Sequence, residues 1–358
     1  MLLSAGICAC TASTLCAQTG KDSDKMLDKT FQSSAGALKY LLFVPKNYDE
    51  TKKYPLVVAL HGAGSTYITS TDNFEMAHPW IEDSIQARVP HFIMVPEPIT
   101  GTWGPIGQSP SNGVMNSSSK AVIEGVEDLK KQYSLDTNRF ILTGFSLGGS
   151  GTYHIIELTP NYWAAAVPAS AGGDSGQTEK LAKTPIWHHQ GSTDGTAGQR
   201  MAKGLENHNH KVVRIVVDFN INTPAGWRTA MQGATDPTTV AYKNIRAPLT
   251  VDSLRRAING GADFLYTELT GGNHEAGWMG AAHNPLVAAW AFSKVKGGAP
   301  PVSLAPKAGK TVARRNGSVL SIGVLTRWTD QGAMGFYDIQ GRNLRIFRER
   351  HALTRLNP

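Results

Sequence analysis

The sequence predicts an α/β fold, in which a mainly parallel sheet lies between two layers of helices. Short apolar runs alternate along the chain with segments of helical spacing, which is the pattern of βαβ units. The clearest run is apolar throughout, as expected of a strand buried on both faces. A composition of 41% apolar and 18% charged residues is typical of a globular protein, and 358 residues suffice for one large domain and a small extra module.

Short apolar runs mark the predicted strands. These runs span 39–45, 54–60, 91–96, 139–143, 163–168, 184–189 and 264–269. The run from Tyr54 to Leu60 ends at His61-Gly62 and is typical of a buried parallel strand. Helices are predicted over 119–133, 147–158 and 285–296. Residues 210–250 contain few clear elements, and we expect them to be an insertion in a main domain that spans 36–296.

The N-terminal end is predicted to lie outside the main domain. Leu2 to Ala17 is apolar or small and uncharged, and Leu15-Cys16-Ala17 approximates the small-residue cleavage site of a secretory signal peptide. We therefore expect 1–17 to be a signal peptide, with a buried N-terminal helix as the alternative, and 18–35 to be a flexible lead-in. The first stretch is too short to cross a bilayer and no later apolar stretch approaches eighteen residues, so no membrane span is expected.

The C-terminal end is predicted to form a separate module. Residues 297–309 are rich in Pro, Gly and Ala, which is typical of a linker. The following residues, 310–358, have short β-like segments with a turn at Gln340-Gly341. We expect a small β-like module there.

Cysteine positions and charge distribution exclude several classes of protein. All three cysteines, Cys8, Cys10 and Cys16, lie in the predicted signal peptide, so the mature chain would hold no disulfide, thiolate metal site or cysteine nucleophile. The net charge of +7 belongs to the tail, because 301–358 hold 10 Lys/Arg and 3 Asp/Glu and the first 300 residues hold 25 of each sign. Without a basic stripe elsewhere, nucleic-acid binding is not expected.

The strongest chemical motif is G-x-S-x-G, which runs from Gly144 to Gly148 with Ser146 at its centre. It stands between a predicted strand and a predicted helix, which is the context of a nucleophile elbow. In such a tight turn only glycine fits beside the serine, whose hydroxyl then projects above the sheet at a helix N-terminus. The motif predicts Ser146 as a catalytic nucleophile, against the alternative of a plain glycine-rich turn.

A serine hydroxyl needs a base before it becomes a good nucleophile. His274 follows the last predicted strand in the loop Gly271-Gly272-Asn273-His274, and a glycine-rich loop can carry it to the elbow. We predict His274 to be the base. The less well placed alternatives among the 11 histidines are His188, His189, His208, His210 and His283.

The third member of a triad is an acid that orients the base. Asp194 stands in the loop after the predicted strand 184–189, the position expected after the penultimate strand, and we predict it to be the acid. An aspartate in a loop rich in Gly, Ser and Thr is also a common turn former. Asp174, Asp218 and Asp236 therefore stay open as alternatives.

Acyl transfer also requires N–H donors for the oxyanion. We expect the backbone amides of Leu147, directly after the nucleophile, and of Ala63, in the loop after strand 54–60, to supply them. A generic strand-ending turn is the alternative for the second loop. Trp103 and Trp278 are candidate substrate-binding residues that would form a stacking platform for a sugar or aryl ring, with ordinary loop packing as the alternative.

Five longer stretches form a pattern together, and they are Val44-Pro45 with Tyr48, 55–62 (PLVVALHG), 134–149 (SLDTNRFILTGFSLGG), 184–194, and 266–274 (YTELTGGNH). They resemble carbohydrate esterase family one and the related polyhydroxybutyrate-depolymerase-like esterases of the α/β-hydrolase superfamily. The Asp-x-x-Arg motif from Asp136 to Arg139 is a specific feature of that family. The resemblance covers roughly 35–296. It implies hydrolysis of feruloyl or acetyl esters on plant xylan, or of aliphatic polyesters.

The sequence departs from the family pattern around the acid. Gln190-Gly191 stands where the family usually has His-Gly, Ala197-Gly198 replaces Val-Pro, and the spacing from Asp194 to His274 is longer than usual. These departures concern the acid and the pocket, not the nucleophile. In the tail, 335–342 (GFYDIQGR) resembles the C-terminal secretion-sorting modules of Bacteroidetes- and Fibrobacter-type secreted proteins.

The sequence thus predicts a serine esterase, secreted or at the cell surface, that cleaves feruloyl or acetyl esters of xylan through an acyl-enzyme on Ser146. The alternatives are a polyester depolymerase or peptidase of the same fold, and a catalytically silent carbohydrate-binding surface protein. No metal or organic cofactor is expected, because the triad is complete and the zinc motif H-E-x-x-H is absent from the sequence. The expected partners are a polysaccharide or small ester substrate and, through 310–358, a secretion machinery.

Overall fold

The computed structural model describes residues 25–64, 76–106, 113–219, 242, 244–282 and 284–298, together with five short strands between 312 and 347. The chain divides into two compact units, Met1–Pro300 and Pro301–Pro358. The predicted signal peptide and its three cysteines lie outside the described residues.

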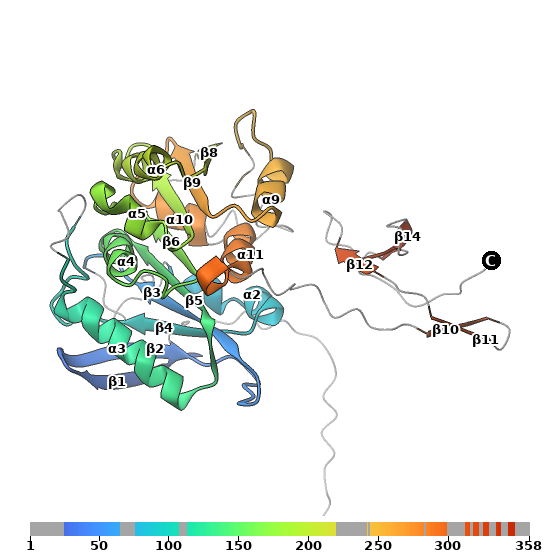
Figure 1. Cartoon of the computed structure of the whole chain (residues 1–358), viewed down its shortest axis with the longest axis horizontal. Coiled ribbons are helices and arrows are strands. Elements are labelled where there is room, and N and C mark those ends of the chain that lie inside the picture. The colour runs from blue at the N-terminus through green and yellow to red at the C-terminus, as the bar shows by residue number, and fades with distance from the viewer. Residues whose placement is uncertain are drawn as a thin grey trace, which may run out of the picture. The chain divides into compact units, whose positions relative to one another are not determined.

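A nine-stranded sheet forms the centre of the first unit (Figure 1). The order of the strands is β1-β2-β4-β3-β5-β6-β7-β9-β8. β2 pairs antiparallel with both β1 and β4, whereas all other neighbours are parallel. The mainly parallel sheet predicted from the sequence is confirmed. The strands are β1 (Leu27–Ser33), β2 (Gly36–Phe43), β3 (Tyr54–Leu60), β4 (Phe92–Pro96), β5 (Leu135–Phe145), β6 (Ala165–Ala169), β7 (Ile186–Gly191), β8 (Val212–Asp218) and β9 (Phe264–Thr270).

Helices cover both faces of the sheet and complete the three layers (Figure 1). Buried side chains of β3 alternate between the two faces, with Leu56 and Val58 in one apolar core and Val57 in the other, as the two-residue period of a strand requires. None of the helices among the described residues combines the length and the apolar character needed to cross a membrane. The first core is covered by α3 (Ser117–Gln132), α4 (Leu147–Leu158), α5 (Thr178–Leu181) and α6 (Ala197–Asn207). The second is covered by α1 (His78–Ile81), α2 (Asp83–Arg88), α9 (Val251–Asn259), α10 (Ala276–Ala282) and α11 (Pro285–Ser293).

Local sequence accounts for where the predicted helices begin. The side chain of Asn116 accepts a hydrogen bond from the amide of Ser119 and caps α3, whose Val122 and Val126 are fully buried. Asn284 caps α11 in the same way, and Pro285 occupies the first position of that helix, where a missing N–H costs nothing.

Two boundaries predicted from the sequence are wrong. The predicted lead-in, 18–35, contains β1, which pairs with β2 along all seven of its residues. The predicted insertion, 210–250, contains β8, which pairs with β9 over seven residues and buries Ile215 and Val217. Both are edge strands with polar or exposed residues between apolar ones, so neither shows a continuous apolar run. Residues 220–241 lie outside the described part of the chain.

The second unit has two small antiparallel sheets. β10 (Val312–Arg315) pairs with β11 (Ser318–Ser321), and β13 (Met334–Tyr337) lies between β12 (Leu325–Trp328) and β14 (Asn343–Phe347). This agrees with the β-like module expected from the sequence. The predicted turn at Gln340-Gly341 lies outside the described residues, and the sorting role stays a prediction.

Candidate active site

The predicted triad residues follow three parallel strands at their carboxyl ends. Ser146 comes directly after β5, Asp194 shortly after β7, and His274 shortly after β9. Because parallel strands end at one edge of the sheet, three segments far apart in the sequence meet there. The three predicted residues thus lie where α/β sheets place their ligands.

The backbone at Ser146 has the strained conformation of a nucleophile elbow. Its φ of 56° and ψ of −115° are values that non-glycine residues rarely adopt. A Cβ on Gly144 would lie 2.2 Å from the carbonyl oxygen of Gly148, and a Cβ on Gly148 would lie 2.0 Å from that of Leu60. The close approach of backbone to backbone therefore requires both glycines of the motif.

Hydrogen bonds join the three predicted residues into one chain. His274 Nε2 lies 2.8 Å from Ser146 Oγ, and His274 Nδ1 lies 2.7 Å from Asp194 Oδ1. The side chain of His274 is 44% exposed, whereas that of Asp194 is 17% exposed. The hydrogen bond with Asp194 raises the pKa of His274 above its ordinary value, against the opposing effect of partial burial, and the negative charges of Asp194 and Glu275 add to the rise. The side chain of His274 is thus partly open to solvent, while that of Asp194 is sheltered.

Contacts between loops fix the position of His274. Ser170, which follows β6, donates its hydroxyl to the carbonyl oxygen of His274 at 2.6 Å. In the acid's loop, the amide and hydroxyl of Thr193 both donate to the carbonyl oxygen of Gly272, at 3.0 and 2.8 Å. The sequence analysis missed Ser170, because a serine after a strand is an ordinary turn residue. Its φ of 48° is visible only in the structure.

The two predicted oxyanion donors lie on segments that meet at the elbow. Leu147 is the first residue of α4, so its amide has no acceptor within the helix. A Cβ on Gly62 would lie 3.5 Å from the Cβ of Ser146, which places the loop after β3, with Ala63, beside the nucleophile. The arrangement is compatible with a shared oxyanion site, and the role of the two amides stays a prediction.

Comparisons with known proteins agree with this fold. No protein-family model matches the chain. It is 23% identical to a protein described as a thermostable esterase, whose crystal structure it matches with a TM-score of 0.54 over 76% of this chain and 64% of that one. The chain has the α/β-hydrolase fold.

Curated proteins similar to this chain are named as esterases. The chain is 28% identical over 154 residues to a bifunctional acetylxylan esterase/xylanase of Neocallimastix patriciarum. The alignment covers 42% of this chain and 21% of that protein. It is 29% identical over 138 residues to a probable feruloyl esterase C of Aspergillus oryzae. That alignment covers 38% of this chain and 48% of the relative. The matches span less than half the length of either relative. The predicted resemblance to carbohydrate esterases is confirmed.

The alternative acids within the described residues make other contacts. Asp174 caps the short 3₁₀ helix η2 (Ser175–Gln177) and accepts a hydrogen bond from the amide of Gly176 at 2.9 Å. Asp218 pairs with Arg246 at the exposed end of β8. Asp236 lies outside the described residues, as does the alternative base His283.

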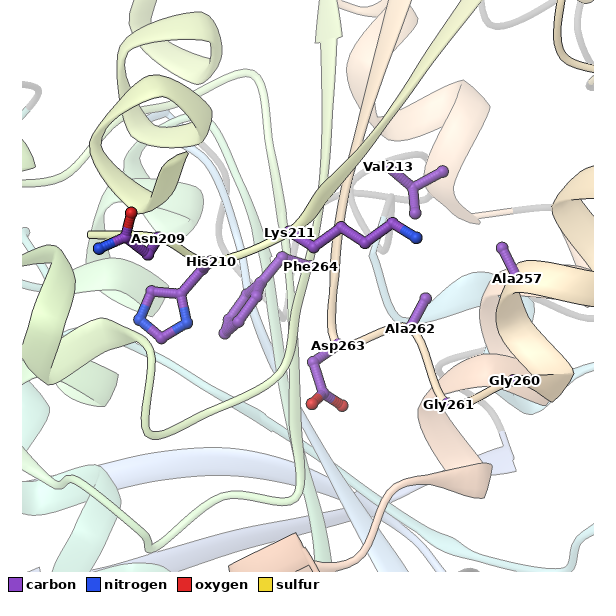
Figure 2. A pocket seen from close by; sticks show the side chains of 10 residues that line it. All are labelled: Asn209, His210, Lys211, Val213, Ala257, Gly260, Gly261, Ala262, Asp263 and Phe264. Carbon is purple, nitrogen blue, oxygen red and sulfur yellow. The ribbon is translucent and has the colours of Figure 1, made fainter. Parts of the chain in front are cut away.

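The remaining alternative histidines have other surroundings. His188 and His189 are buried within β7, and His208 lies 3.6 Å from the carboxylate of Glu179. The ring centroid of His210 lies 5.1 Å from that of Phe264. Both residues border a hollow of about 490 Å³ (Figure 2). That hollow adjoins the first residues of β8 and β9, so it opens at the end of the sheet opposite the triad. Within the described ranges, no group of three or more His, Cys, Asp or Glu side chains is placed to hold a metal ion.

The prediction of a stacking platform at the two tryptophans is wrong. Trp103 is 0% exposed and Trp278 is 3% exposed, so neither offers a face to a ligand. Trp103 donates its indole N–H to the carbonyl oxygen of His61 at 3.0 Å, and Trp278 donates to the carboxylate of Glu275 at 2.6 Å. Both are packing residues. Trp103 supports the loop that carries Ala63, and Trp278, in α10, follows His274 by four residues.

Proposed function

We propose that this protein is a serine esterase that hydrolyses feruloyl or acetyl esters of plant xylan through an acyl-enzyme on Ser146. One observation carries the proposal above all others, namely the hydrogen-bonded chain from Ser146 through His274 to Asp194 at the carboxyl edge of the sheet. The substrate class is supported by the names of the two curated relatives, an acetylxylan esterase/xylanase and a feruloyl esterase.

Acylation begins when Ser146 Oγ attacks the ester carbonyl carbon while His274 Nε2 accepts its proton. Asp194 accepts the Nδ1–H of His274 throughout and stabilises the imidazolium that forms. The amides of Leu147 and Ala63 donate to the negative oxygen of the tetrahedral intermediate. The carbonyl then re-forms, the bond to the sugar oxygen breaks, and His274 Nε2 gives its proton to that oxygen.

Deacylation repeats these steps with water. His274 Nε2 accepts a proton from a water molecule as its oxygen attacks the acyl carbon. The bond to Ser146 Oγ breaks, the proton returns to that oxygen, and the carboxylic acid leaves. The 44% exposure of the His274 side chain gives water access to the base.

The proposed site of action is outside the cell. The apolar, uncharged stretch before Gln18 supports export, and the resemblance of 335–342 to secretion-sorting modules supports a second step of secretion. N-terminal sequencing of protein recovered from the medium of a producing strain should begin at Gln18.

The test of the proposed function is a panel of four substrates: p-nitrophenyl acetate, methyl ferulate, acetylated xylan and polyhydroxybutyrate. We expect turnover of the first and of at least one of the two plant-type esters. Ser146→Ala should lower kcat by roughly 10⁶, the loss seen when a triad serine is removed. Ser150→Ala is the matched control, because Ser150 is a buried serine on α4, the helix that begins directly after Ser146.

Each contrary outcome points to a different alternative. Turnover of polyhydroxybutyrate without turnover of either plant-type ester would favour a polyester depolymerase. A folded wild type that binds xylan but hydrolyses none of the four substrates would favour the silent carbohydrate-binding protein. A folded Ser146→Ala variant that retains more than a few per cent of wild-type activity would show that another group is the nucleophile.

A further inference from the structure

A buried amide holds the side of Asp194 that faces away from the base. Gln190, near the end of β7, is 1% exposed. Its Nε2 lies 2.6 Å from Asp194 Oδ2 and 3.1 Å from the backbone oxygen of Asp194. Both neighbours are acceptors only, so the amide NH₂ of Gln190 must face them. The carboxylate therefore accepts from His274 on one oxygen and from Gln190 on the other.

The orientation of Gln190 determines the hydrogen positions behind it. With its NH₂ toward Asp194, its Oε1 faces His188 Nε2 at 3.0 Å. An amide oxygen only accepts, so His188 must carry its proton on Nε2. His188 Nδ1 is then an acceptor, and the hydroxyl of Tyr153 on α4 donates to it at 2.7 Å. Every donor in this chain points toward Asp194.

Burial keeps this chain of side chains neutral. His188 and Tyr153 are each 2% exposed. Burial lowers the pKa of His188 to about 4, against the smaller raising effects of Gln190 and Asp194, and burial raises the pKa of Tyr153 above its ordinary range. The side chains behind the carboxylate therefore carry no net charge; they are Gln190, His188 and Tyr153. Asp194 keeps its full negative charge to stabilise the imidazolium of His274.

We propose that Gln190 is a positioning residue for the esterase reaction, which it serves by holding Asp194 in the orientation that His274 needs, with His188 and Tyr153 fixing Gln190 from behind. The inference rests on the proposed function of the triad. Gln190 is 1% exposed and its amide contacts Asp194 and His188, so it would act on the reaction through the acid. A residue with that role should affect kcat and leave KM unchanged, and its effect should vanish when the acid is absent.

The test is a double-mutant cycle of Gln190→Met with Asp194→Ala, assayed on p-nitrophenyl acetate and corrected for the Ser146→Ala background. Methionine keeps the length of the side chain and removes both the donor and the acceptor. In the wild-type background we expect kcat to fall roughly 10- to 100-fold with KM unchanged, the effect of one hydrogen bond to a charged group. In the Asp194→Ala background the same change should alter kcat by less than about twofold.

Thr267→Val is the control for a buried polar group lost nearby. Thr267, on β9, is 0% exposed and accepts the indole N–H of Trp187 at 2.9 Å, and neither side chain belongs to the chain that reaches Asp194. We expect this variant to keep kcat within about twofold of wild type. Equal losses from Gln190→Met in both backgrounds would show a merely structural role and overturn the inference.

A second measurement uses the unaltered protein and needs no activity. Nitrogen-15 NMR of the histidine rings distinguishes the two neutral forms of His188. We expect a proton on Nε2 and a bare Nδ1 near neutral pH. A proton on Nδ1 would reverse the chain and overturn the inference whether or not the protein hydrolyses esters. Absence of ester hydrolysis by the wild type would instead count against the proposed function.

Discussion

Asp194→Asn is the substitution whose effect the structure defines most sharply. The new amide group would lie between Gln190 Nε2, a donor 2.6 Å from Oδ2, and His274 Nδ1, 2.7 Å from Oδ1. Only the amide oxygen can accept from Gln190, so the NH₂ must turn toward His274. His274 Nδ1 then becomes an acceptor, and the ring proton moves to Nε2. Nε2 can therefore no longer accept the proton of Ser146.

The expected loss is roughly 10⁴ in kcat, because the base is held in the wrong tautomer while the fold survives. The assay is p-nitrophenyl acetate hydrolysis by four variants side by side, with circular dichroism to check folding. Asp174→Asn, Asp218→Asn and Asp236→Asn should stay near wild type, since Asp174 is a cap and Asp218 an exposed partner of Arg246. Near-normal kcat in Asp194→Asn, together with a large loss of kcat in another variant, would refute the assignment of the acid. The proposal of a serine esterase would still stand.

Three further predictions concern pH, metals and the elbow. Asp194 raises the pKa of His274, and the base must be neutral, so kcat/KM should fall as the pH drops through a midpoint above about 6.5. In a pH–rate profile, Asp194→Asn should move that midpoint to lower pH. An unmoved midpoint would contradict this prediction. Treatment with EDTA should leave activity unchanged, and a loss that added divalent metal restores would show that a metal takes part. Gly148→Ala should lower the free energy of unfolding by about 3 kcal/mol, because the new Cβ would lie 2.0 Å from the backbone oxygen of Leu60, and thermal melts that match wild type would exclude that clash.

The centre of the fold was predictable because its residues leave little choice. β3 and α4 begin and end where the sequence analysis placed them. A continuous apolar run such as Tyr54–Leu60 is stable only where both faces are covered, and the glycines around Ser146 suit only a tight turn. Once the strands were known, the positions of Ser146, Asp194 and His274 after three of them predicted that these residues lie together, because parallel strands end at a single edge.

The edges of the fold were less predictable, because edge strands have fewer neighbours. β1 has the pattern of a polar segment and gains its stability from pairing with β2. β8 carries Arg214, which pairs with Glu206 on the protein surface, so charge masks its buried positions. Only the tertiary partners identify these segments as strands, and one sequence contains no direct signal of those partners.

Side-chain roles outside the motif were hidden for a similar reason. Trp103 stands in a short stretch bounded by two glycines and Trp278 follows His274 by four residues, and sequence alone does not tell a ring that stacks on a ligand from one that packs beneath a loop. The departure at Gln190 could be noted from the sequence. Its contact with Asp194 depends on the way both residues turn after β7, which only the structure shows.

The most direct test of the central claim is covalent trapping of the nucleophile. The folded protein would be treated with a p-nitrophenyl phosphonate, which forms a stable adduct with activated serines, and the modified peptide would be identified by mass spectrometry. We predict a single adduct on Ser146, formed by the wild type and absent from Ser146→Ala. An adduct on another residue, or a folded wild type that hydrolyses esters without forming any adduct, would contradict the proposal that Ser146 carries the acyl group.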